Sequence, residues 1–420
     1  MGEAGERTIL HCDCNGFYAS VECLLRPELR RVPMAVCGDP EQRHGIILAK
    51  NQLAKEKGVQ TAETIWQARR KCPGLVLVPP HREKYEEYSR IVNLIYQQYT
   101  DQVEPFGIDE SWLDVTGSRR LFGEGKEIAD QLRRRVREET GLTISVGVSW
   151  NKIFAKLGSD YKKPDATTVV SRENYRSLVW PLPAGALLFV GGATKKALEE
   201  LGISTVGALA AADPELLTRR LGKLGRELWR YARGEDDSPV RSAYEEREVK
   251  SVGNSITFSR NLVGLEDISA GVAALADSVA ARLRKHGLRC RTVQVMIKDP
   301  AFRTISRQKP LPHPSHLSSE IGRAALELIR ESWSLTAPIR MLAVTGTSLT
   351  EGEEGDQLTL FESQGTRERR LRQEKLEAAM DQVRGRYGRD ALTPGRLLGE
   401  DLGLTRKKGG EGADGKEGEK

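Results

Sequence analysis

Short apolar runs and helical repeats alternate along the first 170 residues of the chain. Unbroken apolar runs of about four to eight residues are typical of buried strands, whereas apolar residues three or four positions apart indicate an amphipathic helix. The runs predict strands at 8–14, 32–37, 45–48, 75–78, 102–106, 108–115 and 144–148. The repeats predict helices at 17–25, 51–57, 65–71, 82–100, 126–140 and 151–160. Elements in this order predict a mixed region with a mostly antiparallel sheet.

The pattern changes twice further along the chain. Residues 185–235 read as short helices separated by glycines, which suits either phosphate contact through backbone N–H groups or a small packed bundle. A polar stretch at 234–248 predicts a linker. Residues 249–348 then follow a β-α-β-β-α-β order, a common single-sheet module. The acidic, polar composition beyond 350 predicts a flexible tail that contains a charged helix at 366–388.

Three acids stand in apolar surroundings. Asp109 and Glu110 are adjacent within the predicted strand at 108–115, and Asp13 lies in the predicted strand at 8–14. A buried carboxylate needs a partner or a metal, because an isolated charge is costly to remove from water. Three carboxylates on two strands are the minimum set for holding two Mg²⁺ ions, which serve in-line phosphoryl transfer. The leading hypothesis is therefore a nucleotide-polymerising enzyme.

The distribution of charge along the chain indicates what kind of molecule the protein binds. The chain has 420 residues and a net charge of +6, and residues 240–350 carry the whole excess, with 16 Lys and Arg against 10 Asp and Glu. A basic module beside an acidic site suits a polyanion that is gripped in one place and processed in another. The basic residues cluster most densely at 282–291, where a solvated face is the plain alternative.

Cysteine spacing and hydropathy indicate in which cellular compartment the protein is expected. The six cysteines match no zinc spacing, and His11, Cys12 and Cys14 point to alternating faces of one strand, so reduced thiols are expected. The sequence contains no run of 18 apolar residues, so no membrane span is predicted, and no apolar signal segment follows the polar N-terminus. We expect a cytoplasmic protein without membrane contact.

Three motifs in order resemble those of the Y-family translesion DNA polymerases, and most closely the bacterial DNA polymerase IV group. The first is Asp13–Glu22, the second is Ile108–Asp114, and the third is Ser149–Lys156 with Ser159–Pro164. The resemblance runs over about residues 8–350. It implies an α+β multidomain right hand, with a palm, small fingers, a helix-hairpin-helix thumb and a β-α-β-β-α-β little finger.

The resemblance implies domain boundaries as well. The palm takes residues 1–16 and 80–170, the fingers 17–79, the thumb 171–238, a linker 239–248, the little finger 249–350 and the flexible tail 351–420. The first thumb hairpin, at 188–192, departs from the family pattern, whereas the second, at 221–225, fits it better, and we expect the thumb to contact the DNA backbone.

The same resemblance assigns roles residue by residue. Asp13, Asp109 and Glu110 match the catalytic, metal-binding carboxylates, and the backbone carbonyl of Cys14 matches a fourth ligand for two Mg²⁺ ions. Asp114 reads as a structural acid. The implied activity is template-directed addition of deoxynucleotides to a primer end, with low fidelity, low processivity and bypass of damage.

The nucleotide site is implied by further matches. Tyr18 matches the steric gate that excludes a ribose 2′-OH, and Phe17 precedes it. Lys163 matches a lysine that contacts the triphosphate. Lys55 and Gln52 stand where relatives often carry an arginine and a tyrosine, so these two contacts differ from the family pattern.

An apolar pentad in the tail resembles the bacterial sliding-clamp binding motif. Gln357 would hydrogen-bond at the rim of a pocket, while Leu358, Leu360 and Phe361 supply apolar contacts. The expected partners are primer–template DNA, a deoxynucleoside triphosphate and the clamp, and the chain is expected to be a monomer.

Three rival functions remain open on the sequence. A nucleotide cyclase would share the carboxylates but would not explain the basic module. A non-catalytic DNA-binding or clamp-regulating protein would explain the module but not the three acids. A template-independent nucleotidyl transferase, or a restricted inserter, would differ only in what it inserts opposite each template base.

Overall fold

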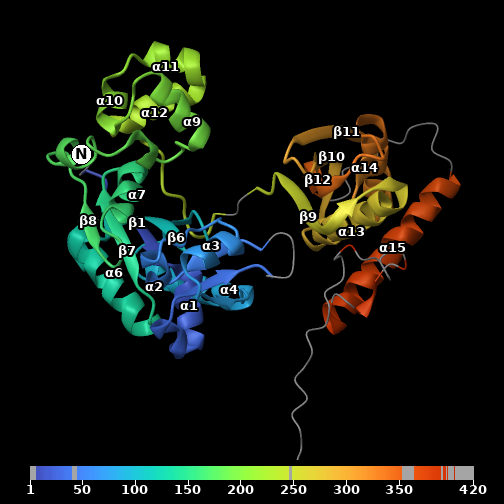
Figure 1. The fold of residues 1–420 in the computed structure, drawn as a ribbon, viewed down its shortest axis with the longest axis horizontal. Coiled ribbons are helices and arrows are strands. Elements are labelled where there is room, and N and C mark those ends of the chain that lie inside the picture. The colour runs from blue at the N-terminus through green and yellow to red at the C-terminus, as the bar shows by residue number, and fades with distance from the viewer. Residues whose placement is uncertain are drawn as a thin grey trace, which may run out of the picture. The chain divides into compact units, whose positions relative to one another are not determined.

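The described part of the chain divides into two compact units, Met1–Glu246 and Arg247–Lys420 (Figure 1). The structure is a computed structural model that describes residues 6–39, 45–245, 248–351, 364–388, 391–393, 395 and 402, with the backbone alone for 364–367. In this part of the chain, no helix is long and apolar enough to cross a membrane.

A five-stranded sheet forms the centre of the first unit, in the order β5-β6-β1-β7-β8. Its strands are β1 (Ile9–Cys14), β5 (Val103–Pro105), β6 (Glu110–Asp114), β7 (Ile144–Ser149) and β8 (Thr167–Val169). All neighbouring strands pair antiparallel except β7 and β8, which are parallel. The prediction of a mixed region with a mostly antiparallel sheet is confirmed, although the short strand β8 was not expected.

Strand β1 is buried on both faces, and its side chains alternate between them. Leu10 and Cys12 join a core with the helices α4 (Arg82–Gln97) and α6 (Gly125–Thr140). Ile9 packs on the other side, against Ala155 of α7 (Lys152–Tyr161). The odd-numbered residues of β1 therefore face α7.

A smaller region inserted after β1 contains a three-stranded sheet in the order β3-β2-β4. Its elements are α1 (Phe17–Leu25), η1 (Pro27–Arg31), β2 (Met34–Cys37), β3 (Ile47–Lys50), α2 (Gln52–Glu56), α3 (Ile65–Lys71) and β4 (Val76–Val78). Gly16 has a left-handed backbone, with φ of 54°, at the turn from β1 into α1. That turn places the start of α1 directly after Asp13 and Cys14.

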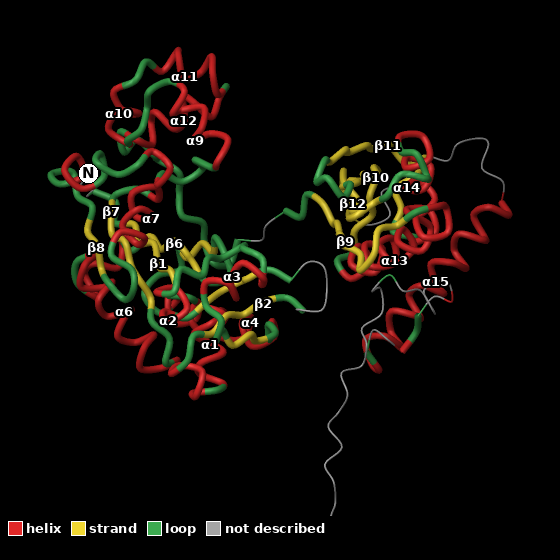
Figure 2. The backbone as a smooth tube through the Cα atoms, viewed as in Figure 1, coloured by secondary structure: helices red, strands yellow, loops and turns green. Residues whose placement is uncertain are grey.

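The third region of the first unit is built from helices and loops alone (Figure 2). Its main helices are α9 (Gly192–Glu200), α10 (Val206–Ala211), α11 (Pro214–Leu221) and α12 (Lys223–Ala232). Leu198, Leu209, Leu217 and Leu228, one from each helix, share a core. The remaining short helices of the unit are η2 (Thr116–Ser118), α5 (Arg119–Phe122), α8 (Tyr175–Leu178) and η3 (Ala184–Ala186).

The chain that leaves the helical region runs along the five-stranded sheet. Val240 is buried, the backbone N–H of Arg241 donates to Glu104 at 3.0 Å, and the N–H of Ala243 donates to the carbonyl of Asp101 at 2.9 Å. The first residues of the segment expected to be a linker are thus hydrogen-bonded to the edge of the sheet.

The second unit has the predicted β-α-β-β-α-β order, which forms an antiparallel sheet in the order β11-β10-β12-β9. Its elements are β9 (Ser251–Leu262), α13 (Gly264–Lys285), β10 (Leu288–Lys298), β11 (Thr304–Ser315), α14 (Ser318–Ser332) and β12 (Ile339–Glu351). One core joins both helices to the sheet.

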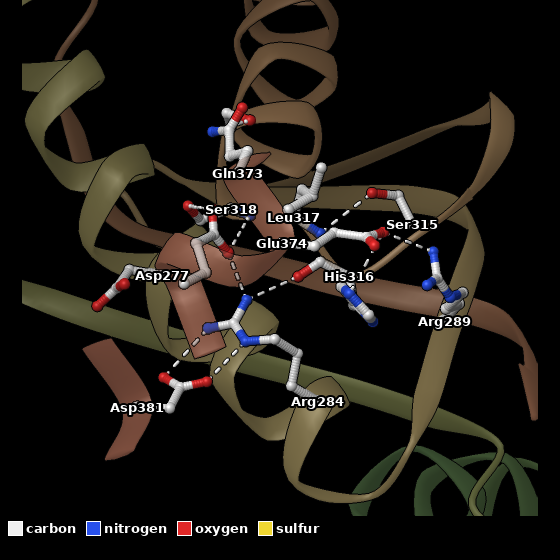
Figure 3. A network of polar contacts seen from close by, with 12 residues as sticks. Asp277, Arg284, Arg289, Ser315, His316, Leu317, Ser318, Gln373, Glu374 and Asp381 are labelled. Atoms are coloured by element: carbon white, nitrogen blue, oxygen red, sulfur yellow. Dashed lines mark hydrogen bonds and ion pairs between the residues drawn. The ribbon is translucent and has the colours of Figure 1, made fainter. Parts of the chain in front are cut away.

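A last helix, α15 (Gln364–Tyr387), confirms the charged helix predicted at 366–388. It packs on the second unit through ion pairs (Figure 3), in which Arg284 contacts Asp381 at 2.6 Å and Arg289 contacts Glu374 at 2.9 Å. Glu377 also contacts Arg284 and accepts hydrogen bonds from the backbone and hydroxyl of Ser318 at the start of α14. Two arginines of the predicted basic cluster are therefore already paired within the chain.

Candidate active site

Asp13 and Glu110 are neighbours across two strands. Asp13 is an odd-numbered residue of β1, so its carboxylate lies on the α7 side of the sheet, where it is 8% exposed. The antiparallel register pairs Asp13 with Glu110, the first residue of β6. Directly paired side chains of neighbouring strands lie close together. The sheet thus brings together two acids that are almost one hundred positions apart.

Asp109 reaches the site from a turn. The sequence predicted that it lies inside a strand, but β6 begins only at Glu110, so that expectation is wrong. The backbone N–H groups of Phe106 and Gly107 both donate to the Glu110 carbonyl and close the turn before the strand. The Cys14 N–H donates to the Asp109 carbonyl at 2.9 Å, which fixes this turn against the end of β1.

Two lysines supply positive charge to the carboxylates. Lys156 Nζ lies 3.1 Å from Asp13 Oδ2 and 2.9 Å from Glu110 Oε2. Lys163 Nζ lies 2.8 Å from Asp13 Oδ2. Both lysines also contact Asp160, at 3.2 and 2.8 Å respectively. The acids therefore share two ammonium groups, both of which come from α7 and the residues just after it.

A glycine lets α7 approach the sheet this closely. A Cβ atom on Gly147 of β7 would lie 1.9 Å from the Ala155 carbonyl oxygen and 2.4 Å from the Ser159 nitrogen. Real Cβ atoms do not tolerate such distances, so any larger residue would force the helix away from the strand. This close packing sets the reach of Lys156 toward Asp13.

The charges of the acids are unequally compensated. Burial and the neighbouring carboxylates of Asp13 and Glu110 raise the pKa of Asp109 to about 6. Burial opposes ionisation of Glu110 as well, but the His11 ring and the Lys156 ammonium outweigh it and lower its pKa to about 2. Asp109 is thus the acid with the least positive charge around it.

His11 is a further member of the cluster. Its buried ring lies between Ser159 Oγ, 2.8 Å from Nδ1, and Glu110 Oε2, 3.3 Å from Nε2. Burial lowers the pKa of His11. Neither His11 nor Lys156 was among the site residues predicted from the sequence, although His11 lies just before the first motif and Lys156 lies within the third.

The cluster fits a divalent cation. Ligand atoms of His11, Asp13 and Glu110 all lie within 4.8 Å of one another, and Asp109 lines the same cavity. The ammonium of Lys156 already bridges two of the carboxylates, at a place where a positive ion is stabilised. Oxygen-rich ligand sets of this kind suit hard cations such as Mg²⁺.

The carboxylates open into a cavity of about 490 Å³. The residues that also line it include Phe17, Tyr18, Cys14 and three lysines, which are Lys50, Lys156 and Lys163. The side chain of Cys14 itself turns into the apolar core, and burial raises its pKa well above the usual value. Only its backbone is therefore suited to a role at the metal site.

A second cavity, of about 540 Å³, shares Lys50 and Lys163 with the first. Gln52 and Lys55 of α2 line it together with Lys50 and Arg30, two cations that sequence analysis did not single out. The Gln52 amide donates to Glu56 at 3.1 Å on its own helix. Four basic side chains around one cavity favour an anion such as a triphosphate.

Two other sequence assignments have different outcomes. Asp114 accepts hydrogen bonds from the backbone and hydroxyl of Thr116, at 3.0 and 2.5 Å, which confirms a structural acid. The clamp-like pentad with Gln357, Leu358, Leu360 and Phe361 lies outside the described residues.

Comparison with known proteins identifies the family of the chain. The impB/mucB/samB family model matches residues 12–160, and the model of that family's C-terminal domain matches residues 249–360. Together they cover more than half of the chain. The first match includes the three acids and the second contains the whole β-α-β-β-α-β module.

Relatives of high similarity span almost the full chain. The DNA polymerase IV of Acetivibrio thermocellus is 48% identical over 401 residues, which cover 96% of this chain and 100% of that protein. The DNA polymerase IV 1 of Bacillus subtilis is 36% identical and covers 95% of each chain.

A solved Y-family DNA polymerase chimera of Dbh and Dpo4 has the same fold. It matches with a TM-score of 0.74 and 23% identity over 82% of this chain and 100% of its own. This chain therefore belongs to the Y family of translesion DNA polymerases, in its DNA polymerase IV group, and is a DNA-directed DNA polymerase that uses a divalent metal.

Proposed function

We propose that Asp13, Asp109 and Glu110, with the backbone carbonyl of Cys14, hold two Mg²⁺ ions beside an incoming deoxynucleotide. The observation that carries this proposal is the convergence of the three acids on one cavity together with Lys156 and Lys163. When bound, the two ions would supply Lewis acidity at the primer 3′-hydroxyl and neutralise charge on the triphosphate.

The chain's own residues bind and orient the nucleotide. Lys163 lies between the two cavities, so it can contact the metal-side oxygens and the outer phosphates of one triphosphate. Lys55 adds a point charge in the second cavity, and Gln52 can turn from Glu56 to donate to phosphate. Phosphoryl transfer asks mainly for positioning and charge neutralisation, which these groups provide.

Tyr18 is proposed as the steric gate, with Phe17 packed behind it. The two rings lie 5.8 Å apart, and both border the cavity that contains the acids. A 2′-hydroxyl on the sugar would compete for the space of the Tyr18 ring, so deoxyribose is selected.

The domain assignment follows from the same site. We assign the five-stranded sheet, residues 1–16 and 80–170, to the palm, residues 17–79 to the fingers and residues 171–238 to the thumb. Residues 239–248 are the linker, 249–350 the little finger and 351–420 the tail. The basic little finger would grip duplex phosphates without sequence preference, and that binding weakens as salt rises.

The clamp contact remains a proposal from sequence. Gln357, Leu358, Leu360 and Phe361 would fill a pocket on a sliding clamp and raise the low processivity of a polymerase that acts as a monomer. Low fidelity and damage bypass are expected because small fingers press little on the nascent base pair.

Primer extension tests the metal-site proposal. With Mg²⁺ and all four deoxynucleotides, the full chain should extend a primed template, and Asp109→Asn should lower kcat/KM about 10³-fold, which corresponds to about 4 kcal/mol. Asp114→Asn is the matched control, since Asp114 binds Thr116 instead of lining the cavity.

Each rival predicts a different product. A cyclase would convert free nucleoside triphosphate into a cyclic product without primer, and a template-independent transferase would insert nucleotides regardless of the template base. Extension that survives Asp109→Asn would refute the carboxylate assignment. Clamp added to the wild type and to a Leu360→Ala, Phe361→Ala variant tests the pentad, because only the wild type should gain product length.

A further inference from the structure

Glu22 is a carboxylate buried at 0% exposure that the proposed chemistry leaves without a role. It lies one turn after Tyr18 on α1, so the two side chains share a face of that helix. Glu22 Oε1 accepts a hydrogen bond from the Tyr85 hydroxyl at 2.5 Å and lies 2.8 Å from His81 Nδ1. Arg26 is farther away, at 3.9 Å. A buried carboxylate is retained at a cost, so its contacts call for an explanation.

The hydroxyl that Glu22 holds belongs to a ring that lies flat on Tyr18. The Tyr85 and Tyr18 rings stack with centroids 4.1 Å apart and an angle of 11° between their planes. Tyr85 comes from α4 and is completely buried, whereas Tyr18 is half-buried and borders the active-site cavity. Tyr85 thus forms a support beneath the ring proposed as the gate.

The contacts of Tyr85 with Tyr18 and Glu22 connect α4 to α1. Tyr18 and Glu22 are fixed relative to each other by α1, and Tyr85 touches both, with its hydroxyl on one and its ring on the other. Burial and Glu22 raise the pKa of Tyr85, so the hydroxyl keeps its proton and donates it in a hydrogen bond. This hydrogen bond to Glu22 anchors the Tyr85 hydroxyl to α1.

We infer that Glu22 and Tyr85 are positioning residues that set how strictly Tyr18 excludes ribonucleotides. This inference rests on the proposed role of Tyr18 as the steric gate. A gate works by contact, so a tyrosine ring that can tilt away from the sugar admits the extra hydroxyl. The stack prevents the tilt, and the hydrogen bond to Glu22 keeps the supporting Tyr85 ring against α1.

Sugar selectivity in single-nucleotide insertion tests the inference. The measured quantity is the ratio of kcat/KM for a deoxynucleotide to that for the matching ribonucleotide on the same primed template. Tyr85→Phe keeps the ring and removes the hydroxyl, and it should lower this ratio about 3- to 10-fold, the range expected for one lost hydrogen bond. The change should come from better ribonucleotide use, chiefly through KM.

Two further variants separate positioning from general damage. Glu22→Leu should lower the ratio as Tyr85→Phe does, while Glu22→Gln should restore part of it because the amide oxygen can still accept the Tyr85 hydrogen bond. The double variant Tyr85→Phe, Glu22→Leu should be no worse than either single variant, since both remove one interaction. Tyr96→Phe is the matched control, because Tyr96 is another buried tyrosine of α4.

The outcomes distinguish this inference from the gate itself. Tyr18→Ala should abolish most of the selectivity, and if it leaves the ratio unchanged, the gate assignment fails and this inference fails with it. If Tyr18→Ala relaxes selectivity but Tyr85→Phe and Glu22→Leu lower only the melting temperature and leave the ratio at its wild-type value, as Tyr96→Phe should leave it, then Glu22 is structural and the inference alone is overturned.

Discussion

Lys156 is one of two ammonium groups that neutralise the acidic cluster, and its removal should destabilise the chain in a way that Mg²⁺ reverses. Its ammonium contacts Asp13, Glu110 and Asp160 at 3.1, 2.9 and 3.2 Å, and its side chain is only 15% exposed. Lys156→Met keeps a similar length and apolar bulk but leaves the carboxylates facing one another. Lys163 still contacts Asp13 at 2.8 Å and compensates in part.

The expected loss can be bounded from these contacts. At an effective dielectric constant of about 20, each contact near 3 Å is worth about 5 kcal/mol before the cost of desolvation. Removing one partner of a buried ion pair costs about 3–5 kcal/mol in practice, and the remaining Lys163 favours the lower end. A loss of about 3 kcal/mol should lower the melting temperature of the first unit by about 6–12 °C.

Bound Mg²⁺ should restore most of the folding stability that Lys156→Met loses. A ligand at one hundred times its dissociation constant adds about 2.7 kcal/mol to folding stability, nearly the amount removed. The assay is calorimetric unfolding of the full chain with EDTA and with excess Mg²⁺, beside Lys126→Met, which breaks an exposed pair with Asp130. Equal destabilisation of Lys156→Met in both conditions would refute the idea that this ammonium occupies the place of a cation.

Three further predictions concern packing and pH. Gly147→Ala should cost about 3 kcal/mol in urea unfolding because its methyl group would overlap α7, whereas Gly74→Ala, with open space around it, should cost almost nothing. Glu377→Ala should speed amide exchange in the first turn of α14, and unchanged exchange would show that its contacts with Ser318 do not stabilise that end. Burial and Arg289 lower the pKa of His316 to about 4, so the unfolded chain takes up a proton between about pH 6.5 and 4 that the folded chain does not. Stability should therefore fall on acidification through that window, by at most about 2 kcal/mol at pH 5, and His316→Asn should flatten this pH dependence of urea unfolding.

Local patterns predicted most elements of the fold because the apolar spacing is strong. Helix α3 has the predicted bounds, and the six elements of the second unit occur in the predicted order. The strand predicted from residue 108 begins only at Glu110, because apolar spacing does not fix where a strand starts. An apolar run tells where a chain is buried, but the start of β6 is decided by backbone hydrogen bonds to the Glu110 carbonyl. Short elements such as β8 and α8 carry too few residues for a periodic signal.

The acids of the site could be predicted, whereas their partners could not. Asp13 and Lys156 are 143 positions apart, and nothing in either local sequence indicates that α7 will lie against β1. The same holds for α15, which was predicted only as a charged helix within a flexible tail. Its carboxylates pair with Arg284 and Arg289, which lie more than eighty positions earlier in the chain.

The alternation of side chains along β1 determines which residues enter the apolar core and which reach the active site. Leu10 and Cys12 enter the apolar core on one face, while His11 and Asp13 reach α7 on the other. A shift of one residue in the register of this strand would exchange the two sets. Asp13 would then be buried among apolar side chains without Lys156, which would add the cost of an unpaired buried acid to the loss of packing. The charge that serves the active site therefore also selects the register of the central strand.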